Sequence, residues 1–470
     1  MNNLRNSLLK HFILILLLLC TTNSQAIYWQ DVSRINSINI SQVFKVQSES
    51  DAIEAINYAK QQGKKVVIAG TKHSQGGHIL FPDAVLLNMK SFNKVIDLNL
   101  KQKRIKVQSG ISWAEIQQVI NPHRLSVAVM QSSNIFSIGG SLSANIHGRD
   151  PRYGPLIETV ISLKVLLASG DILIVSRQSH ADIFHSVMGG FGVIAVILEA
   201  ELQLIDDTML AKSTTQVDYD AYIANLKENT SDLELHYGRC SFVKGKDFLQ
   251  ECYSVDYRQT DSDPANFSLV DEQNIERNAF FFNLSRHSDF GKILRWHFQR
   301  AWLDIPETTQ IVSRNNAMRP PIKFLDFKNP KETDILQEYF IPLDQFASYM
   351  ASLKMILTKQ DVNLLSLTLR YVKHNSDSLL AYSKQDSIAI VLYININLEP
   401  AAIKHAKEWT IKLVDSAIEH QGSYYLVYQR FPTLEQFQTT YPRWQEFTQI
   451  KKRHDPDMLF NNLFYQTYLH

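Results

Sequence analysis

Three glycine-rich segments, 70–77, 138–148 and 188–192, place the strongest constraint on how this chain can fold. Glycine clusters make close turns, and they leave backbone N–H groups free to approach a diphosphate without an obstructing side chain. Ordinary turns are the alternative for any one of them, although their combination in one domain argues against it. None is a dinucleotide fingerprint of the Rossmann kind, because Gly190 and Gly192 lack the third glycine and no strand–turn–helix unit surrounds them. A classical NAD fold is therefore disfavoured.

Short apolar strands alternate with amphipathic helices around these segments, from residue 43 to residue 204. The spacing predicts a helix over 51–62, a strand over 64–69 that ends at Gly70, and a hairpin of 159–167 with 172–175. It also predicts strands over 84–88, 95–97 and 104–109, and a helix over 112–120. This pattern indicates an α+β domain with many short strands.

The remainder of the chain, from about residue 205 to residue 441, is richer in aromatic residues and has a different rhythm. Strands are expected near 337–341, 364–372 and 387–396, and a helix over 401–419. A chain of 470 residues is long enough for two substantial cores. The sequence predicts a second, mixed sheet-and-helix domain placed over the first.

The N-terminus has the features of a signal peptide over residues 1–26. Arg5 and Lys10 give it a positive start, 12–20 an apolar stretch, and 24–26 a small-residue cleavage site. Nine apolar residues are too few for a permanent anchor, the alternative, which needs roughly 20. We expect a secreted or periplasmic protein that keeps no transmembrane helix after cleavage. The net charge of +1, without a dense basic stripe, argues against nucleic acid as a partner.

Export would remove Cys20 and leave Cys240 and Cys252, in two strand-like runs over 233–243 and 248–255. A disulfide across this predicted hairpin and two separate thiols are both open, and an oxidising compartment favours the bond. No His/Cys cluster has zinc-like spacing, so no metal site is expected.

The first glycine-rich segment resembles a loop of FAD-binding domains of the vanillyl-alcohol-oxidase type, also called the p-cresol-methylhydroxylase (PCMH) type. In sugar and aldonolactone oxidases and in cytokinin dehydrogenases, a Gly-x-x-His-Ser loop wraps the FAD diphosphate, and its histidine is bonded to the flavin 8α-methyl group. The resemblance implies FAD as cofactor, attached covalently through His73, with a non-covalent flavin as the alternative. The cofactor-binding residues it implies here are Gly70, Thr71, Lys72, His73, Ser74, Gln75 and Gly76.

The second and third segments carry the same likeness. Residues 131–150 are similar to the stretch that passes under the flavin, above all to an Ile-His-Gly-Lys form in decaprenylphosphoryl-ribose oxidases, which implies that His147 lies near the reactive flavin edge. A buried structural His147 is the alternative. Residues 182–194 resemble the segment that surrounds the adenosine end of FAD in this family, where the main chain of Ile194 would contact the adenine. The other implied cofactor contacts are Ser132, Gly139, Gly140 and Ser141, with free backbone N–H groups expected at the last three, and Gly189 and Gly192.

A fourth likeness lies near the C-terminus, in 441–447 and 451–461. It is very close to the closing segment of decaprenylphosphoryl-ribose oxidases, where the chain returns to the FAD domain, and it adds Asn461 to the implied cofactor contacts. The predicted organisation is a signal peptide over 1–26, a two-subdomain PCMH-type FAD-binding domain over 27–205, a substrate or cap domain over 206–440, and a returning segment over 441–470.

Oxidation of a CH–OH group passes hydride to flavin N5, so the protein must orient that C–H bond, take up a proton and stabilise the reduced ring with a cation. Arg370 lies in a stretch, 367–373, that resembles the strand bearing Glu-x-Arg in aldonolactone and alditol oxidases and a catalytic lysine in decaprenylphosphoryl-ribose oxidases. Alternation puts Thr368 and Arg370 on one face and turns Lys373 away. Arg370 is preferred over Lys373 as the catalytic cation, with a solvated surface arginine as the alternative. Thr368 replaces the glutamate of the alditol pattern, which weakens a direct transfer of that mechanism.

The run 336–342 resembles a glutamine-bearing cavity strand of the decaprenylphosphoryl-ribose group. Either Gln337 or Glu338 would face the flavin, and alternation does not choose between them. Tyr424, Tyr425 and Tyr428 could line the same cavity, although an aromatic run is more often packing.

These features predict an FAD-dependent oxidase or dehydrogenase for a sugar, polyol or aldonolactone, with O2 or another electron acceptor. Oxidation of a polyprenyl-phosphate-linked sugar, as half of an epimerisation, is the enzyme alternative. A secreted flavin-binding protein without turnover is the other alternative.

Overall fold

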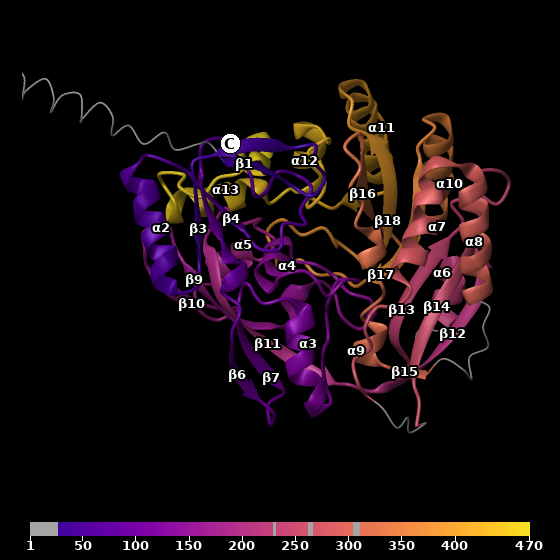
Figure 1. Cartoon of the computed structure of the whole chain (residues 1–470), viewed down its shortest axis with the longest axis horizontal. Coiled ribbons are helices and arrows are strands. Elements are labelled where there is room, and N and C mark those ends of the chain that lie inside the picture. Colours follow the sequence, from indigo (N-terminus) through magenta and orange to yellow (C-terminus); the bar gives the residue numbers. More distant parts are fainter. Residues whose placement is uncertain (1–26, 229–231, 262–266, 304–310) are drawn as a thin grey trace, which may run out of the picture.

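A computed structural model gives the fold of residues 27–228, 232–261, 267–303 and 311–470. The predicted signal peptide lies outside the described residues. Figure 1 shows two halves side by side, one built from the indigo-to-magenta part of the chain with the yellow C-terminal segment, and one from the pink and orange part. Within the described ranges, no helix is long and apolar enough to cross a bilayer.

The first half begins with a small parallel sheet in the order β3-β5-β4. Helix α2 packs on it through the buried residues Ala52, Ala55, Ile56 and Ala59, and Ser48 caps the start of this helix by accepting a hydrogen bond from the Asp51 N–H. A separate two-stranded ribbon, β1-β2, precedes it. The elements are β1 (Ile27–Gln30), β2 (Ser37–Ile40), β3 (Gln42–Lys45), α2 (Glu49–Gln61), β4 (Val66–Ala69) and β5 (Val85–Asn88).

A second sheet of the first half has the order β10-β9-β11-β7-β6, with β8 paired to β11. All of its pairings are antiparallel, including the predicted hairpin of β9 with β10. The glycine-rich segment after β8 forms the short helix α4. The elements are β6 (Val95–Asn99), β7 (Arg104–Gln108), α3 (Trp113–Ile120), β8 (Leu125–Val127), α4 (Ile138–Ala144), β9 (Val160–Leu166), β10 (Ile172–Val175), α5 (Ala181–Val187) and β11 (Val196–Asp206).

The second half is built on an eight-stranded antiparallel sheet in the order β15-β12-β14-β13-β17-β18-β16-β19. Its strands are β12 (Met209–Asp218), β13 (Leu233–Cys240), β14 (Glu251–Gln259), β15 (Ile311–Ser313), β16 (Glu332–Pro342), β17 (Leu364–Val372), β18 (Ser387–Asn397) and β19 (Ser423–Tyr424). Cys240 lies directly opposite Cys252 in the β13–β14 hairpin, and the two form a disulfide. The structure therefore decides in favour of the bond.

Helices cover both faces of this large sheet. On one face, Tyr349 of α10 packs on Tyr339 and Tyr222 of α6 hydrogen-bonds His236, while α11 packs along β16 and β18. On the other face, α7 and α8 cover only part of the sheet, through Phe282 on Tyr393 and Trp296 on Tyr253. The remaining helices are α6 (Tyr222–Glu228), α7 (Ile275–His287), α8 (Asp289–Leu303), α9 (Arg314–Ala317), α10 (Phe346–Lys359) and α11 (Pro400–Glu419).

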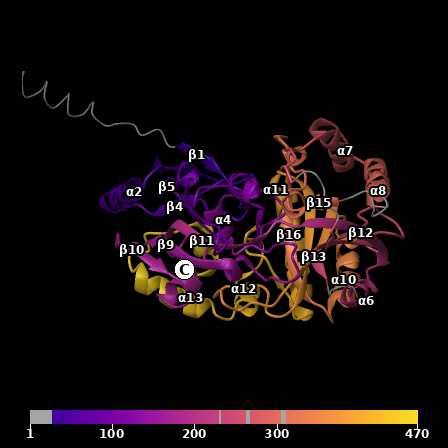
Figure 2. The ribbon, with the colours of Figure 1, turned by 90° about the horizontal axis from the view of Figure 1, so that it is seen from below.

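The C-terminal segment lies against the first half, as Figure 2 shows from below. It carries α12 (Leu434–Thr440), α13 (Trp444–His454) and α14 (Leu463–Tyr468). Val66 of β4 donates to the Leu459 carbonyl at 2.7 Å and accepts from the Asn461 N–H at 3.1 Å. The end of the chain thus extends the small parallel sheet beside the first glycine-rich segment.

Candidate active site

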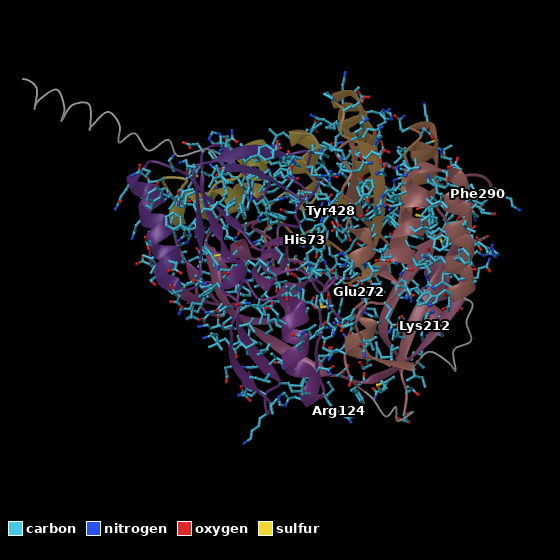
Figure 3. The ribbon with its side chains drawn as sticks, in the orientation of Figure 1. His73, Arg124, Lys212, Glu272, Phe290 and Tyr428 are labelled. Atoms are coloured by element: carbon cyan, nitrogen blue, oxygen red, sulfur yellow. A yellow bond between two sulfur atoms is a disulfide. The ribbon has the colours of Figure 1, made fainter. Side chains whose placement is uncertain are left out.

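A cavity of about 390 Å³ lies where the two halves meet. The first half lines it with the glycine-rich segments, and the second half lines it with the face of the large sheet that α7 and α8 leave open. His73 and Tyr428, which lie near the middle of the molecule in Figure 3, both line it. The cavity therefore has a glycine-rich wall and a sheet wall.

On the glycine-rich wall, two glycines lie so close to neighbouring serines that they leave no room for a side chain. A Cβ on Gly70 would come within 2.0 Å of the Ser137 hydroxyl, and one on Gly139 within 3.0 Å of the Ser109 Cβ. The hydroxyls of Ser74 and Ser109 are buried and have no hydrogen-bond partner in the described chain. Buried hydroxyls normally find a partner, so this wall is shaped for a polar group that the protein alone does not supply.

His73 projects from the same wall and packs edge-on against Phe136, with 4.8 Å between the ring centroids. Burial lowers the pKa of His73 to about 4, so its imidazole is neutral at physiological pH. Beside it, the Lys72 ammonium lies 3.3 Å from the centroid of the Trp29 ring. The loop thus offers a neutral imidazole and a positive charge to the cavity.

The pleat of the strands determines which side chains form the sheet wall. Arg239, Thr368, Val391 and Glu338 are directly paired neighbours on β13, β17, β18 and β16, so they form one row on one face. All four line the cavity. Ser366, Tyr393 and Leu336 form a second lining row across the last three of these strands. Period-two alternation therefore selects which residues face the site.

A buried polar cluster joins the two walls. The His147 Nε2 lies 2.6 Å from the Glu338 Oε1, and the Tyr428 hydroxyl donates to the Glu338 Oε2 at 3.0 Å. Burial acts to raise the pKa of Glu338, but His147, Arg370 and Tyr428 outweigh it and hold this pKa below its ordinary value. Glu338 is thus an ionised carboxylate. Since a carboxylate only accepts, the Nε2 of His147 carries a proton, and its buried Nδ1 has no hydrogen-bond partner in the described part of the chain.

The structure answers the choice between Gln337 and Glu338. Gln337 points to the opposite face and donates to the Gln429 Oε1 at 2.6 Å, whereas Glu338 lines the cavity. Arg370 lines the cavity and Lys373 does not, in keeping with the alternation along β17. Gln337 and Lys373, which were predicted as catalytic candidates, are therefore excluded, because neither lines the cavity.

Most of the predicted cofactor contacts line the cavity, and their individual roles remain predictions. Those that do so are Gly70, Thr71, Lys72, His73, Ser74, Ser132, Gly139, Gly140, Ser141, His147 and Gly192.

Five others lie outside it. The Gln75 side chain accepts from the Leu336 N–H and from Gln429, which ties the two halves together, and a Cβ on Gly76 would meet the Tyr428 carbonyl at 2.3 Å. Asn461 belongs to the returning segment beside Val66. Gly189, whose φ is +76°, and Ile194 pack the loop behind the lining residues.

One expectation about backbone donors is wrong. The Gly139 N–H donates to the Ser109 carbonyl at 2.7 Å and the Ser141 N–H to the Ser137 carbonyl at 3.0 Å, so neither is free. The reason is that Ser141 makes a hydrogen bond of helix α4 itself, whereas Gly139 at the start of this helix pairs with the residue that follows β7.

Sequence reasoning missed a set of arginines on the sheet side. Arg149, Arg239 and Arg295 line the cavity together with Arg370. The available signal for Arg239 was a charged residue in an apolar strand, two positions from Tyr237 and on the same face. Arg295 lies on α8, and no strand period could have connected it with the others. Tyr425 and Tyr428 line the cavity, whereas Tyr424 is buried behind it.

These features fit FAD. The glycine-rich wall presents the unpartnered hydroxyls of Ser74 and Ser109 and the unpartnered Nδ1 of His147, and the sheet wall presents the unpartnered Nε of Arg370. An elongated group with a diphosphate and a flat polar ring would satisfy both walls. Such a glycine-rich cleft under a sheet-and-helix cap defines the class of proteins with a PCMH-type FAD-binding domain.

Comparison with known protein families supports an FAD-binding domain in this chain. Residues 40–176 match the family described as FAD binding domain. Residues 201–468, more than half of the chain, match the family described as D-arabinono-1,4-lactone oxidase, and the chain belongs to this family.

Individual proteins that the chain resembles are named as oxidases or dehydrogenases of sugar lactones. The chain is 26% identical over 201 residues to L-gulonolactone oxidase of Bos taurus, covering 43% of this chain and 44% of that one. It is 27% identical over 179 residues to L-galactono-1,4-lactone dehydrogenase 2, mitochondrial, of Oryza sativa subsp. japonica (38% and 30%). It is 24% identical over 178 residues to D-arabinono-1,4-lactone oxidase of Candida glabrata (37% and 34%). The matched segments thus span less than half of the length of these relatives.

Proposed function

We propose that the protein is an FAD-dependent oxidoreductase that oxidises a CH–OH group of a sugar, polyol or aldonolactone. The observation that carries the proposal is the buried His147–Glu338 pair at 2.6 Å, whose free Nδ1 has no partner in the described chain and whose ring borders the FAD cavity. The names of the relatives, which refer to oxidases and dehydrogenases of sugar lactones, support the same chemistry.

When bound, FAD supplies the hydride acceptor. The task left to the protein is to remove the hydroxyl proton and to orient the C–H bond. His147 accepts that proton at Nδ1, while Glu338 holds the ring in the required tautomer and stabilises the positive charge that the imidazole gains. Tyr428 fixes the second carboxylate oxygen through its 3.0 Å hydrogen bond. This arrangement needs no movement of Glu338 during the reaction.

Two further groups complete the site. Arg370 carries a positive charge to the same region, where it stabilises negative charge that develops on the ring or the substrate. Phe340, Tyr382 and Tyr425 surround His147, with ring centroids 5.4, 6.0 and 6.3 Å from its own. These aromatic rings exclude water, which strengthens the interactions of His147 with Glu338 and with substrate.

The test is anaerobic reduction of the purified yellow protein by a panel of sugars, polyols and aldonolactones. At least one of them should bleach the flavin absorbance near the visible maximum within seconds. Readmission of oxygen, or addition of an artificial dye, then shows whether O2 or another acceptor reoxidises it. A flavin that no member of the panel reduces would overturn the proposal.

We further propose that the FAD is attached covalently through His73. The bond would join an imidazole nitrogen of His73 to the flavin 8α carbon, with loss of the imidazole N–H hydrogen and one methyl hydrogen, while two electrons pass to the ring and then to the acceptor that reoxidises it. The neutral state of His73, whose pKa burial lowers to about 4, supports this role because only the unprotonated nitrogen is a nucleophile. After acid precipitation, yellow colour should stay with the polypeptide, and in His73→Ala it should remain in the supernatant.

The disulfide between Cys240 and Cys252 supports the export expected from the signal peptide, since such bonds persist in oxidising compartments. We propose a secreted or periplasmic protein whose mature chain starts near Ile27. N-terminal sequencing of the product from a bacterial expression host should give a start within a few residues of Ile27, and an intact Met1 would contradict export.

A further inference from the structure

Four arginines converge on the sheet side of the cavity, three from separate elements and one from a loop. Arg239 lies on β13, Arg370 on β17, Arg295 on α8, and Arg149 follows α4. Their charges act on one another. Burial, with smaller contributions from Arg370 and Arg239, lowers the pKa of Arg149 to about 10, and burial and then Arg239 lower the pKa of Arg295 to about 9. Guanidinium groups are charged at neutral pH, so the cavity gathers positive charge that repels itself.

None of these four arginines forms an ion pair with a carboxylate in the described part of the chain. Buried arginines elsewhere in the molecule do. Arg314 is paired with Asp150 and Glu234. Arg286 is paired with Asp334. Burying a guanidinium is costly unless an anion compensates it, so Arg149, Arg239 and Arg295 lack the carboxylate partner that this protein provides to its structural arginines.

Neutral partners hold the cavity arginines in place instead. Arg239 donates to the Ser366 hydroxyl at 2.9 Å, Arg295 to the Leu365 carbonyl at 2.6 Å, and Arg149 to the Ser132 hydroxyl at 3.1 Å. Aromatic rings support them from the side. Arg149 lies 4.6 Å from the centroid of the Tyr237 ring, and Arg295 lies 4.1 Å from that of Phe282. A guanidinium has five N–H donors, so each of these side chains keeps donors for a ligand.

The positions of Arg239 and Arg295 separate them from the glycine-rich cradle, whereas Arg149 directly follows it and donates to Ser132, one of the predicted cofactor contacts. The glycine-rich loops belong to the first half, whereas Arg239 and Arg295 belong to the second. Arg239 lies in the same cross-strand row as Glu338, three strands away, which corresponds to about 14 Å between their backbones. The long Arg239 side chain covers part of that span. The remaining gap suits a sugar whose reacting carbon lies at His147 and whose far end lies at the arginines.

We propose that the substrate is an anionic sugar, and that its carboxylate or phosphate is bound by Arg149, Arg239 and Arg295. The proposal rests on the proposed function, since it names the substrate class of that same site. Guanidinium groups match both oxyanions with paired hydrogen bonds, so the shared chemistry is a sugar bearing an oxyanion distant from the oxidised CH–OH group.

Binding tests the site without any turnover. Titration calorimetry on the holoprotein would use inorganic phosphate, D-glucose 6-phosphate, D-glucuronate and D-glucose as probes. Binding of the phosphorylated or the carboxylated probe at least 10-fold tighter than D-glucose is the expected result, and which of the two binds better distinguishes phosphate from carboxylate. Equal affinity for all the sugars, with no binding of inorganic phosphate, would overturn the inference.

Variants connect that binding to the named residues. Arg239→Gln and Arg295→Gln should each weaken the anionic probe by roughly 10- to 100-fold while changing D-glucose binding much less, the loss expected for one charge-assisted hydrogen bond. Arg277→Gln, an exposed arginine on α7, removes the same charge outside the cavity and should change neither. Arg239→Lys, which keeps the charge, should recover part of the affinity and shows that the fold is intact. Equal weakening by Arg277→Gln would reduce the effect to net charge and contradict the site.

Flavin bleaching distinguishes this inference from the function on which it rests. If anionic sugars bind at the arginines but no sugar bleaches the flavin, the proposed oxidation fails and the anion site stands. If neutral lactones bleach the flavin with kcat/KM equal to or above that of anionic sugars, the oxidation stands and the anion site fails.

Discussion

At the scale of single residues, the site depends on the orientation of one imidazole by one carboxylate. Glu338 uses both of its oxygens, one at His147 and one at Tyr428, so its charge and its position are fixed together. Proton removal by a positioned base contributes about 100- to 10,000-fold to catalysis. The charge of Glu338 should therefore affect the chemical step far more than it affects the binding of substrate.

Glu338→Gln keeps the shape and removes the charge. We expect the rate of anaerobic flavin bleaching at saturating substrate to fall by about 100-fold or more, with less than a few-fold change in the substrate concentration for half-saturation. Tyr428→Phe should have a smaller effect in the same direction. Glu332→Gln, on the same strand but outside the cavity, serves as the control. A large change in apparent affinity with an unchanged bleaching rate would contradict the assigned role of Glu338.

A second residue-scale consequence concerns acid stability. His78 is sandwiched between Phe191 and Phe464, with ring centroids 4.7 and 5.1 Å away, and burial lowers its pKa to about 3. In the unfolded chain it binds a proton near pH 6.5, whereas in the folded chain it does so only near pH 3. Stability is therefore lost as the pH falls through this window and levels off below it.

His78→Phe retains the stacking and removes the titration. Between pH 7 and pH 5, the free energy of unfolding of the natural protein should fall by about 2 kcal/mol more than that of the variant. Urea unfolding followed by tryptophan fluorescence at both pH values measures the difference. Parallel losses in the two proteins would show that His78 does not resist protonation in the folded state.

At the scale of elements, the large sheet brings the key side chains to the site through strand pairing. Arg239, Thr368, Val391 and Glu338 come from positions far apart in the sequence and become one row. The β13–β14 hairpin that ends this row is closed by the disulfide between Cys240 and Cys252. The hairpin also holds Arg239, so its stability bears directly on the sheet wall.

Cys240→Ala together with Cys252→Ala should lower the free energy of unfolding by roughly 3 kcal/mol, the loop-closure effect expected for a 12-residue separation. Urea titration of the double variant measures this change. Natural protein treated with dithiothreitol should unfold at the same urea concentration as the double variant. A double variant as stable as the oxidised protein would contradict the proposed contribution.

Sequence patterns predicted the elements best where a single period dominated. The alternation of β17 was predicted at 364–372, which agrees with its observed bounds, and the hairpin of β9 and β10 was predicted from its turn. Helix α4 was not predicted, because Gly139 and Gly140 disfavour a helix and only tertiary packing stabilises one there. Gln337 and Glu338 are both buried, so hydrophobicity could not show which of them faces the cavity.

Contacts between residues far apart in the sequence could not be predicted from local sequence patterns. The His147–Glu338 pair spans 191 residues, and no local period connects its two members. The resemblance placed each of them near the flavin separately, but their hydrogen bond is a product of the packing of the two halves. The same holds for Arg295, whose helix reaches the cavity only through tertiary packing.

At the scale of the whole molecule, the C-terminal segment closes the fold on its beginning. Lys451 and Asp455 form a buried ion pair, and the Asp455 carboxylate also accepts from the N–H groups of Leu459 and Phe460 at 2.8 and 2.9 Å. Leu459 and Phe460 belong to the stretch that pairs with Val66 beside the first glycine-rich segment. The ion pair thus fixes the returning segment against the cofactor side of the molecule.

Asp455→Asn leaves the Lys451 charge buried without its partner. We expect a loss of about 3–5 kcal/mol in the free energy of unfolding, measured by urea titration, together with weaker retention of FAD where it is not covalently held. Adding Lys451→Met to Asp455→Asn removes the orphaned charge and should restore part of the loss. A double variant less stable than the single one would show that the pair does not act through its charge.

The pleated wall of the cavity also makes this protein suited to redesign. Ser366, Tyr393 and Val391 face the cavity, while the residues between them on β17 and β18 point into the helix-covered core. A combinatorial library restricted to these alternate positions would vary the shape presented to substrate and leave the glycine-rich cradle unchanged. Selection of new specificities on this chain could therefore proceed on one face of one sheet, without renewed optimisation of cofactor binding.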